Sequence, residues 1–255
     1  MSALKTYLKK VIPDSVLKSR ERYIERKRRE EFQRCAMPRE TFSRVYECGY
    51  WGKSKEQGER YYSGIGSHVD EYVDSYISAV SGFLQSFGKK PDVVDLGCGD
   101  FAIGSRVRPY CGNYIAVDVV EGLIERNKKR YANDSVDFRV FDIINDDLPK
   151  GDVVFLRQVL QHLSNREIEK VVAKLPAKYR FLILTEHLPL SGSFVPNVDI
   201  MRGPDIRLTI GKEGSGVILT EPPFNMKVAK STLLCEVLNE GSEPKSVVRT
   251  NLYEF

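Results

Sequence analysis

The sequence predicts an α/β fold in which a mostly parallel sheet carries helices on both faces. Short apolar runs alternate with segments of helical periodicity from residue 67 onward. The first of these runs also ends in an acidic, glycine-rich turn, 95–100. Alternating strands and helices favour right-handed crossovers and a ligand site at the carboxyl ends of the strands.

The elements follow in order along the chain. From Ser67 the apolar residues recur every three or four positions, which predicts one amphipathic helix that stops at Gly88. A short helix follows Phe101, and two further helices are predicted over 121–131 and 164–175, the last opening with a capping box. The predicted strands cover residues 93–96, 114–117, 136–141, 152–157, 181–185, 232–238 and 246–255.

Length and composition restrict the class of protein. A chain of 255 residues suits one α/β domain with extensions. It contains no apolar run of the roughly 20 residues that a membrane span needs, and its start lacks the features of a signal peptide. Five cysteines without a C-x-x-C pair indicate reduced thiols and speak against zinc. We therefore expect a cytoplasmic protein.

The positive charge is concentrated in the first 34 residues. They hold eleven Lys and Arg against five Asp and Glu, a net +6, and the whole chain is +4, so 35–255 carries −2. The negative net charge of residues 35–255 excludes a nucleic-acid-binding surface on that part of the chain. Residues 2–34 read as a helix broken at Pro13, with apolar Leu4, Tyr7, Leu8 and Val11 beside lysines. Such a helix suits peripheral contact with an anionic membrane. It could instead dock on the body or on a second subunit of an oligomer, or remain solvated.

The turn after the first strand indicates a nucleoside-containing cofactor. Gly97 and Gly99 let the backbone approach a ligand closely, and Asp118 ends the second strand at the spacing of a ribose-binding acid. A dinucleotide would bring a pyrophosphate to this turn, where Asp95 and Asp100 would repel it. The sulfonium and ammonium of S-adenosylmethionine suit an acidic turn. The charges therefore favour S-adenosylmethionine.

The run Asp95-Leu96-Gly97-Cys98-Gly99-Asp100 resembles the first motif of the class I S-adenosylmethionine-dependent methyltransferases. The resemblance covers residues 90–188 well. It implies a Rossmann-like, doubly wound, mostly parallel seven-stranded sheet with an antiparallel last strand. It also implies cofactor contacts from the turn (Asp95, Gly97, Cys98, Gly99), at the ribose (Asp118, Val119), at the adenine (Asp142, Ile143) and after the fourth strand (Arg157, Gln158).

A second glycine-rich turn precedes this core. Ser63, Gly64 and Ser67 could offer hydroxyl and N–H groups to the methionyl carboxylate, and Trp51 could cover the sulfonium by a cation–π contact. A buried tryptophan beside an ordinary turn is the alternative. The position resembles a lead-in of uncharacterised bacterial methyltransferases that accompany polysaccharide synthesis. We thus divide the chain into 1–66, a basic helical extension with a cofactor-capping segment, and 67–255, the cofactor-binding domain.

Two of the three histidines stand at predicted strand ends and are candidate catalytic bases. His162 follows the fourth strand and His187 the fifth, and His68 is expected to be structural or near the cofactor. Glu186 is an alternative base. Glu186 and Asp199 could hold a divalent ion, but two acids without a third ligand do not predict a metal site.

The run Glu221-Pro222-Pro223-Phe224 resembles the signature of enzymes that methylate base amines, but it stands after the fifth strand instead of the fourth. We interpret it as a turn with Phe224 facing the acceptor. Long loops such as 186–225 are usually functional, so this one is expected to shape the acceptor pocket.

The resulting prediction is an S-adenosylmethionine-dependent methyltransferase that acts on a hydroxyl of a sugar or glycan intermediate and not on nucleic acid. Methylation of another small molecule or of a protein is the nearest alternative. A non-catalytic cofactor-binding regulator is an alternative of a different class. It would keep Asp95 and Asp118 but would need neither His162 nor His187.

Overall fold

The structure is a computed structural model that describes residues 14–239 and 245–255. The chain divides into two compact units, Met1–Met37 and Pro38–Phe255. The first contains helix α2 (Asp14–Gln33). The predicted amphipathic stretch from Leu4 to Val11 lies outside the described residues. The second unit begins at Pro38, and the predicted domain boundary was between residues 66 and 67. Residues 38–66, called the capping segment below, therefore pack as part of the sheet unit.

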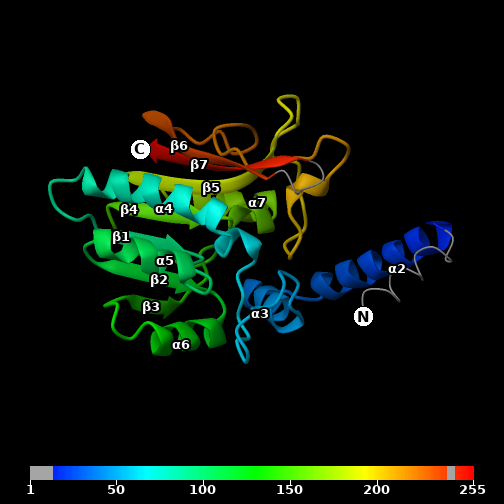
Figure 1. The fold of residues 1–255 in the computed structure, drawn as a ribbon. Helices are drawn as coiled ribbons and strands as arrows, with labels where there is room; N and C mark the ends of the chain where they lie inside the picture. The colour runs from blue at the N-terminus through cyan, green and yellow to red at the C-terminus, as the bar shows by residue number, and fades with distance from the viewer. Residues whose placement is uncertain (1–13, 240–244) are drawn as a thin grey trace. The chain divides into compact units, whose positions relative to one another are not determined.

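The described residues form one seven-stranded sheet in the order β3-β2-β1-β4-β5-β7-β6 (Figure 1). Strand β7 runs antiparallel to both of its neighbours, and the pairs among β1 to β5 are parallel. The predicted Rossmann-like sheet with an antiparallel last strand is confirmed. The strands are β1 (Val93–Leu96), β2 (Tyr114–Asp118), β3 (Asp137–Val140), β4 (Val153–Arg157), β5 (Phe181–Pro189), β6 (Lys230–Asn239) and β7 (Ser246–Glu254).

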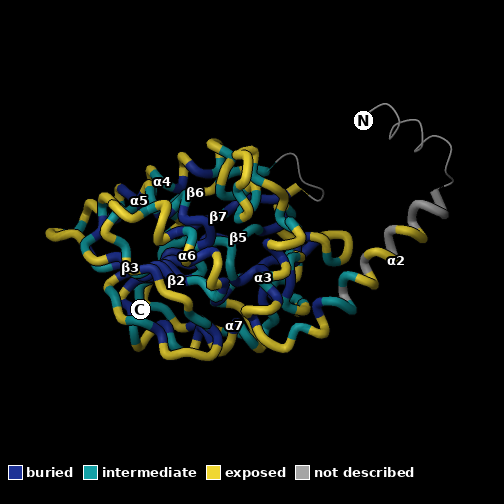
Figure 2. Tube along the Cα trace, turned by 90° about the horizontal axis from the view of Figure 1, so that it is seen from below, coloured by how far each residue is buried: buried dark blue, intermediate teal, exposed yellow. Residues whose placement is uncertain are grey.

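Helices cover both faces of the sheet because successive strand residues point to opposite sides. On one face Val93 and Phe155 pack with α4 and α5, and on the other Val94 and Leu156 pack with α7. The buried residues concentrate in these two layers (Figure 2). The helices of this unit are α3 (Pro38–Cys48), α4 (Asp70–Gln85), α5 (Ala102–Val107), α6 (Glu121–Arg130) and α7 (Asn165–Val172), with 3₁₀ turns η1 (Ile65–Ser67), η2 (Arg108–Tyr110), η3 (Leu160–His162) and η4 (Arg207–Thr209). No helix in the described part of the chain is long and apolar enough to cross a membrane.

Strand β5 continues to Pro189, beyond the predicted end at residue 185. It pairs with β7 along its whole length, from Phe181 opposite Glu254 to Pro189 opposite Ser246. Backbone pairing with a distant strand therefore extends β5 past the end of its apolar run. As a result His187 lies within β5 and does not follow it, which corrects the predicted position.

The long connection from β5 to β6 is fixed to the turn after β4 by a buried arginine. The guanidinium of Arg207, on η4, donates hydrogen bonds to the carbonyls of Leu160 (3.3 Å), Gln161 (3.2 Å) and Leu163 (2.8 Å). Phe224 packs against the core on the α7 side of the sheet and does not line the central cavity, so its predicted place at the acceptor is wrong.

Candidate cofactor and acceptor site

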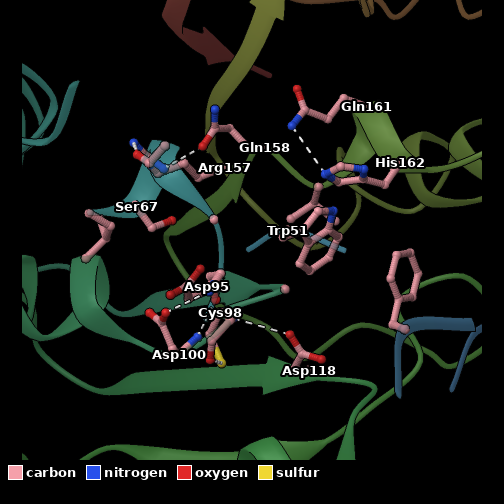
Figure 3. A pocket seen from close by; sticks show the side chains of 18 of the residues that line it. Trp51, Ser67, Asp95, Cys98, Asp100, Asp118, Arg157, Gln158, Gln161 and His162 are labelled. Atoms are coloured by element: carbon pink, nitrogen blue, oxygen red, sulfur yellow. Dashed lines mark hydrogen bonds between the residues drawn. The ribbon is translucent and has the colours of Figure 1, made fainter. Parts of the chain in front are cut away.

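A large cavity lies at the carboxyl ends of β1, β2 and β4, where the parallel-sheet rule places a ligand (Figure 3). Its volume of about 440 Å³ is in the range of small-molecule sites. Every residue predicted for the site lines this one cavity: Trp51, Ser63, Gly64, Ser67, Asp95, Gly97, Cys98, Gly99, Asp118, Val119, Asp142, Ile143, Arg157, Gln158, His162 and His187.

The two glycines of the first turn are required by packing as well as by backbone conformation. Gly97 and Gly99 have φ of +79° and +55°, in the region that favours glycine. A Cβ on Gly97 would lie 2.6 Å from Cγ2 of Val159, and one on Gly99 would lie 2.5 Å from Oγ of Ser63. The turn is therefore enclosed by the loop after β4 and by the capping segment, and a ligand would enter between them.

Asp118 ends β2 with its carboxylate held by backbone groups. One oxygen accepts the N–H of Gly99 at 3.3 Å, and the other accepts that of Val120 at 3.0 Å. Burial outweighs these bonds and raises the pKa of Asp118 to about 6. The carboxylate thus lies beside the turn, where it can receive two ribose hydroxyls.

This raised pKa predicts that cofactor binding is linked to proton release. Ribose hydroxyls bonded to Asp118 would stabilise its carboxylate form, so binding would lower the pKa of Asp118 and release a proton at any pH where Asp118 is protonated in the free protein. Affinity for S-adenosylhomocysteine should be level above about pH 7 and fall as the pH drops through 6, by up to about tenfold per pH unit. Calorimetric titrations from pH 5 to 8 measure this directly. An affinity that is constant over that range would contradict it.

The two other acids of the turn differ in role. Asp95 is buried and accepts a hydrogen bond from the hydroxyl of Tyr114 at 3.0 Å, and burial raises its pKa to about 7. Asp100 anchors the capping segment, because it accepts the N–H of Ser63 at 2.9 Å and bonds Nε2 of His68 at 2.7 Å. Burial raises the pKa of Asp100, but these bonds outweigh it and leave that pKa below its usual value. Asp100 therefore remains ionised.

The capping segment forms an aromatic wall of the cavity. The Trp51 ring lies 5.2 Å from that of Tyr46 and 4.8 Å from that of His162, centroid to centroid. Its Nε1 donates to the carbonyl of Pro204 at 3.3 Å. Ser63 exchanges hydrogen bonds with Asp100, since its hydroxyl accepts the N–H of Asp100 at 2.8 Å. Trp51 and Ser63 therefore join the capping segment to the loop after β5 and to the first turn.

The predicted adenine acid has local partners. Asp142 accepts the N–H of Ile144 at 2.9 Å and the side-chain amide of Asn145 at 2.7 Å. These bonds fix the turn after β3 and keep Asp142 and Ile143 on the cavity wall. The local turn therefore determines how this wall is presented to a ligand.

His162 stands in η3 with one fixed tautomer. A carbonyl only accepts, so the contact of Nδ1 with the Asp205 carbonyl at 3.3 Å places the ring proton on Nδ1. Nε2 then carries the lone pair and lies 3.3 Å from the side-chain nitrogen of Gln161 (Figure 3). Burial lowers the pKa of His162 to about 4. The imidazole is thus neutral at pH 7, with its acceptor nitrogen toward Gln161.

Glu186 does not line the cavity. Its carboxylate accepts the backbone N–H groups of Leu160 and Gln161, each at 3.1 Å, and burial raises its pKa to about 8. It orders η3 and does not occupy the place of an alternative base. Asp199 accepts the N–H of Asn165 at 2.7 Å. Among the described residues, no group of three or more His, Cys, Asp and Glu side chains could hold a metal ion.

Sequence reasoning missed several residues that shape the cavity. The side-chain amide of Gln161 contacts Nε2 of His162. The only sign of this in the sequence is that the two residues are adjacent. Arg207 holds the loop after β5 against η3, and no local pattern marks it. Tyr46 lines the cavity from α3 and bonds the Ser63 hydroxyl at 3.2 Å.

Comparisons with known proteins agree with this geometry. Residues 94–177, from β1 through α7, match a family model described as a methyltransferase domain. None of the curated proteins matches the sequence significantly. Similar solved structures include the N-methyltransferase NodS from Bradyrhizobium japonicum WM9 in complex with S-adenosylhomocysteine, with 13% identity, 83% of this chain and 97% of that chain covered, and a TM-score of 0.57.

A methyltransferase from Leishmania major described as dependent on S-adenosylmethionine is 14% identical, with coverage of 84% and 82% and a TM-score of 0.55. The N-terminal domain of EvdMO1, crystallised in the presence of S-adenosylhomocysteine and D-fucose, is 15% identical, with coverage of 86% and 97% and a TM-score of 0.51. At these identities the structures show a shared fold.

Proposed function

We propose that this chain, whose residues 94–177 match a methyltransferase domain and whose sheet has the class I methyltransferase order, uses S-adenosylmethionine to methylate a hydroxyl of a sugar or glycan intermediate. The observation that carries the proposal is the polar wall of the cavity. Side chains of Gln158, Gln161, His162 and His187 line it beside the Trp51 ring. Neutral amides and imidazoles bind hydroxyl groups, and an indole face packs against a sugar ring.

The cofactor fits the other end of the cavity. Bound S-adenosylmethionine supplies an electrophilic methyl group on a positively charged sulfur. The glycine turn at 97–99 lets the backbone approach it, and Asp118 would hold the ribose. Asp100, which remains ionised, would provide negative charge for its cationic groups, Asp95 would add to it above a pH of about 7, and Trp51 would cover the sulfonium.

The transfer needs alignment and one proton acceptor. Bound S-adenosylmethionine would supply the methyl group and leave as S-adenosylhomocysteine, and Nε2 of His162 would take the proton that the acceptor hydroxyl loses. The lone pair of His162 is on Nε2, to which the Gln161 amide donates, so the acceptor hydroxyl would take the place of that amide. Holding the two reactants in line contributes most of the acceleration.

Transfer of a labelled methyl group tests this function. We expect the protein to methylate sugar hydroxyls in a panel of monosaccharides and lysate glycan fractions, and to yield no product with matched amines. The variant Asp118→Ala is the negative control, because it removes the ribose contact. If the label enters only amines or proteins and no sugar, the sugar assignment is contradicted. Tight cofactor binding without any transfer would favour a regulator.

We further propose that residues 1–34 bring the enzyme to anionic membranes. Their net charge of +6 supports this, because each basic residue near an anionic surface contributes about 1 kcal/mol. Helix α2, the described part of this segment, is rich in Arg and Lys.

Deleting residues 1–34 should abolish binding to vesicles containing phosphatidylserine and leave the affinity for S-adenosylhomocysteine unchanged. Salt should have the same effect on the full chain, since charge attraction is screened within about 10 Å at 0.1 M. Vesicle co-sedimentation at low and high salt measures both effects, with neutral vesicles as the control. If the full chain does not bind anionic vesicles at low salt, residues 1–34 dock on the rest of the chain or on a second subunit instead.

A further inference from the structure

Arg157 fixes the orientation of the neighbouring glutamine. Its guanidinium is partly buried, lies 5.0 Å from the ring centre of Tyr76, and donates to the carbonyl of Gly66 at 2.7 Å. The other terminal nitrogen donates to Oε1 of Gln158 at 2.9 Å (Figure 3). A guanidinium has donors only, so it determines which end of the Gln158 amide is oxygen.

Gln158 passes this orientation to His187. Its backbone has φ of +56° and its N–H is bonded to the carbonyl of Thr185 at 2.7 Å, which holds the residue against β5. With the amide oxygen toward Arg157, the amide nitrogen lies 3.2 Å from Nδ1 of His187. An amide NH₂ only donates, so Nδ1 must carry the lone pair and Nε2 the proton.

The proton on Nε2 has no partner among the described residues, although the atom is buried. A buried donor left unpaired is unfavourable, and native structures leave few of them. Burial, together with the positive charge of Arg157, lowers the pKa of His187 to about 4, so the ring is neutral at pH 7 and Nε2 carries its only N–H. His187 also lines the cavity, which indicates that a ligand atom completes the bond.

We propose that His187 donates a hydrogen bond from Nε2 to an oxygen of the methyl acceptor, and that the contacts from Arg157 through Gln158 hold it in this tautomer. The identity of the acceptor rests on the proposed function, but the tautomer does not. The two cavity histidines then have opposite roles. His162 offers a lone pair and His187 offers an N–H, so His187 positions the acceptor and does not remove its proton.

Nitrogen-15 NMR of the full-length protein tests the tautomer without any substrate. The chain has three histidines, so single His→Gln variants assign the signals. We expect the proton of His187 on Nε2 in the wild type. Gln158→Glu should move it to Nδ1, because a carboxylate accepts and cannot donate. Gln161→Glu, beside His162, is the matched control and should leave His187 unchanged. A proton on Nδ1 of His187 in the wild type would overturn the proposal.

Steady-state kinetics test the role of His187 in binding the acceptor. The acceptor used is the sugar that is methylated fastest in the labelled-methyl panel. His187→Phe should raise the acceptor KM roughly tenfold to a hundredfold with a smaller effect on turnover. His187→Gln, which can place an amide N–H near the position of Nε2, should recover most of the loss. An unchanged KM in His187→Phe would refute the donor role. Failure of the proposed function is distinct, because no sugar would then be methylated while the NMR result would stand.

Discussion

The variant Asp118→Ala is expected to lose measurable binding of S-adenosylhomocysteine while its fold persists. The carboxylate would accept two hydrogen bonds from the ribose, and loss of both should weaken binding by roughly 10²–10⁴-fold. Calorimetry gives the affinity, and thermal unfolding reports the fold. Asp137→Ala is the control, because Asp137 is an exposed acid of the adjoining strand β3. Unchanged affinity in Asp118→Ala would remove Asp118 from the site.

Gly97→Val should abolish binding by a different route. The φ of +79° disfavours any side chain with a Cβ, and the added atoms would meet Val159, whose Cγ2 lies 2.6 Å from the Cβ position. We therefore expect a lower unfolding temperature as well as lost affinity. Gly88→Ala, at a glycine where a Cβ meets nothing within 4 Å, should change neither. Full affinity in Gly97→Val would show that the turn does not hold the cofactor.

Replacing His162 by glutamine should lower turnover by roughly 10²–10⁴-fold and leave cofactor affinity nearly unchanged, because a general base acts only in the transition state. The pH profile provides a second readout. The base is active when neutral, so the turnover at saturating cofactor should be level from about pH 8 to 5 and fall as the pH approaches the lowered pKa of about 4.

A midpoint near 6.5 in the turnover profile would contradict this assignment, since it would indicate an imidazole of ordinary pKa. A loss confined to the acceptor KM would make His162 a binding group. Preserved turnover in His162→Gln would mean that proximity alone carries the transfer.

The sequence could predict the fold and the cavity lining because both depend on local patterns at strand ends. Asp95, Asp118 and Arg157 each stand at the carboxyl end of a strand, and parallel strands bring these ends together. Such an argument needs the order of the elements along the chain and no knowledge of distant contacts.

The missed features depend on contacts between residues far apart in the sequence. The end of β5 is set by pairing with β7, which placed His187 inside a strand. Pattern analysis could not identify Arg207, because its partners lie more than forty positions earlier in the sequence. These partners are the carbonyls of Leu160, Gln161 and Leu163. The directions in which burial shifts the pKa values of His162 and Asp118 likewise required the packed structure.

The central claim is that the acidic turn selects S-adenosylmethionine over a dinucleotide. Calorimetric titration of the full-length protein with S-adenosylhomocysteine, and separately with NAD, at pH 7.5 tests it most directly. We predict saturable binding of one S-adenosylhomocysteine per chain and no measurable binding of NAD, because Asp95 and Asp100 flank the place of the pyrophosphate. Tight binding of NAD, or no binding of S-adenosylhomocysteine, would contradict this account.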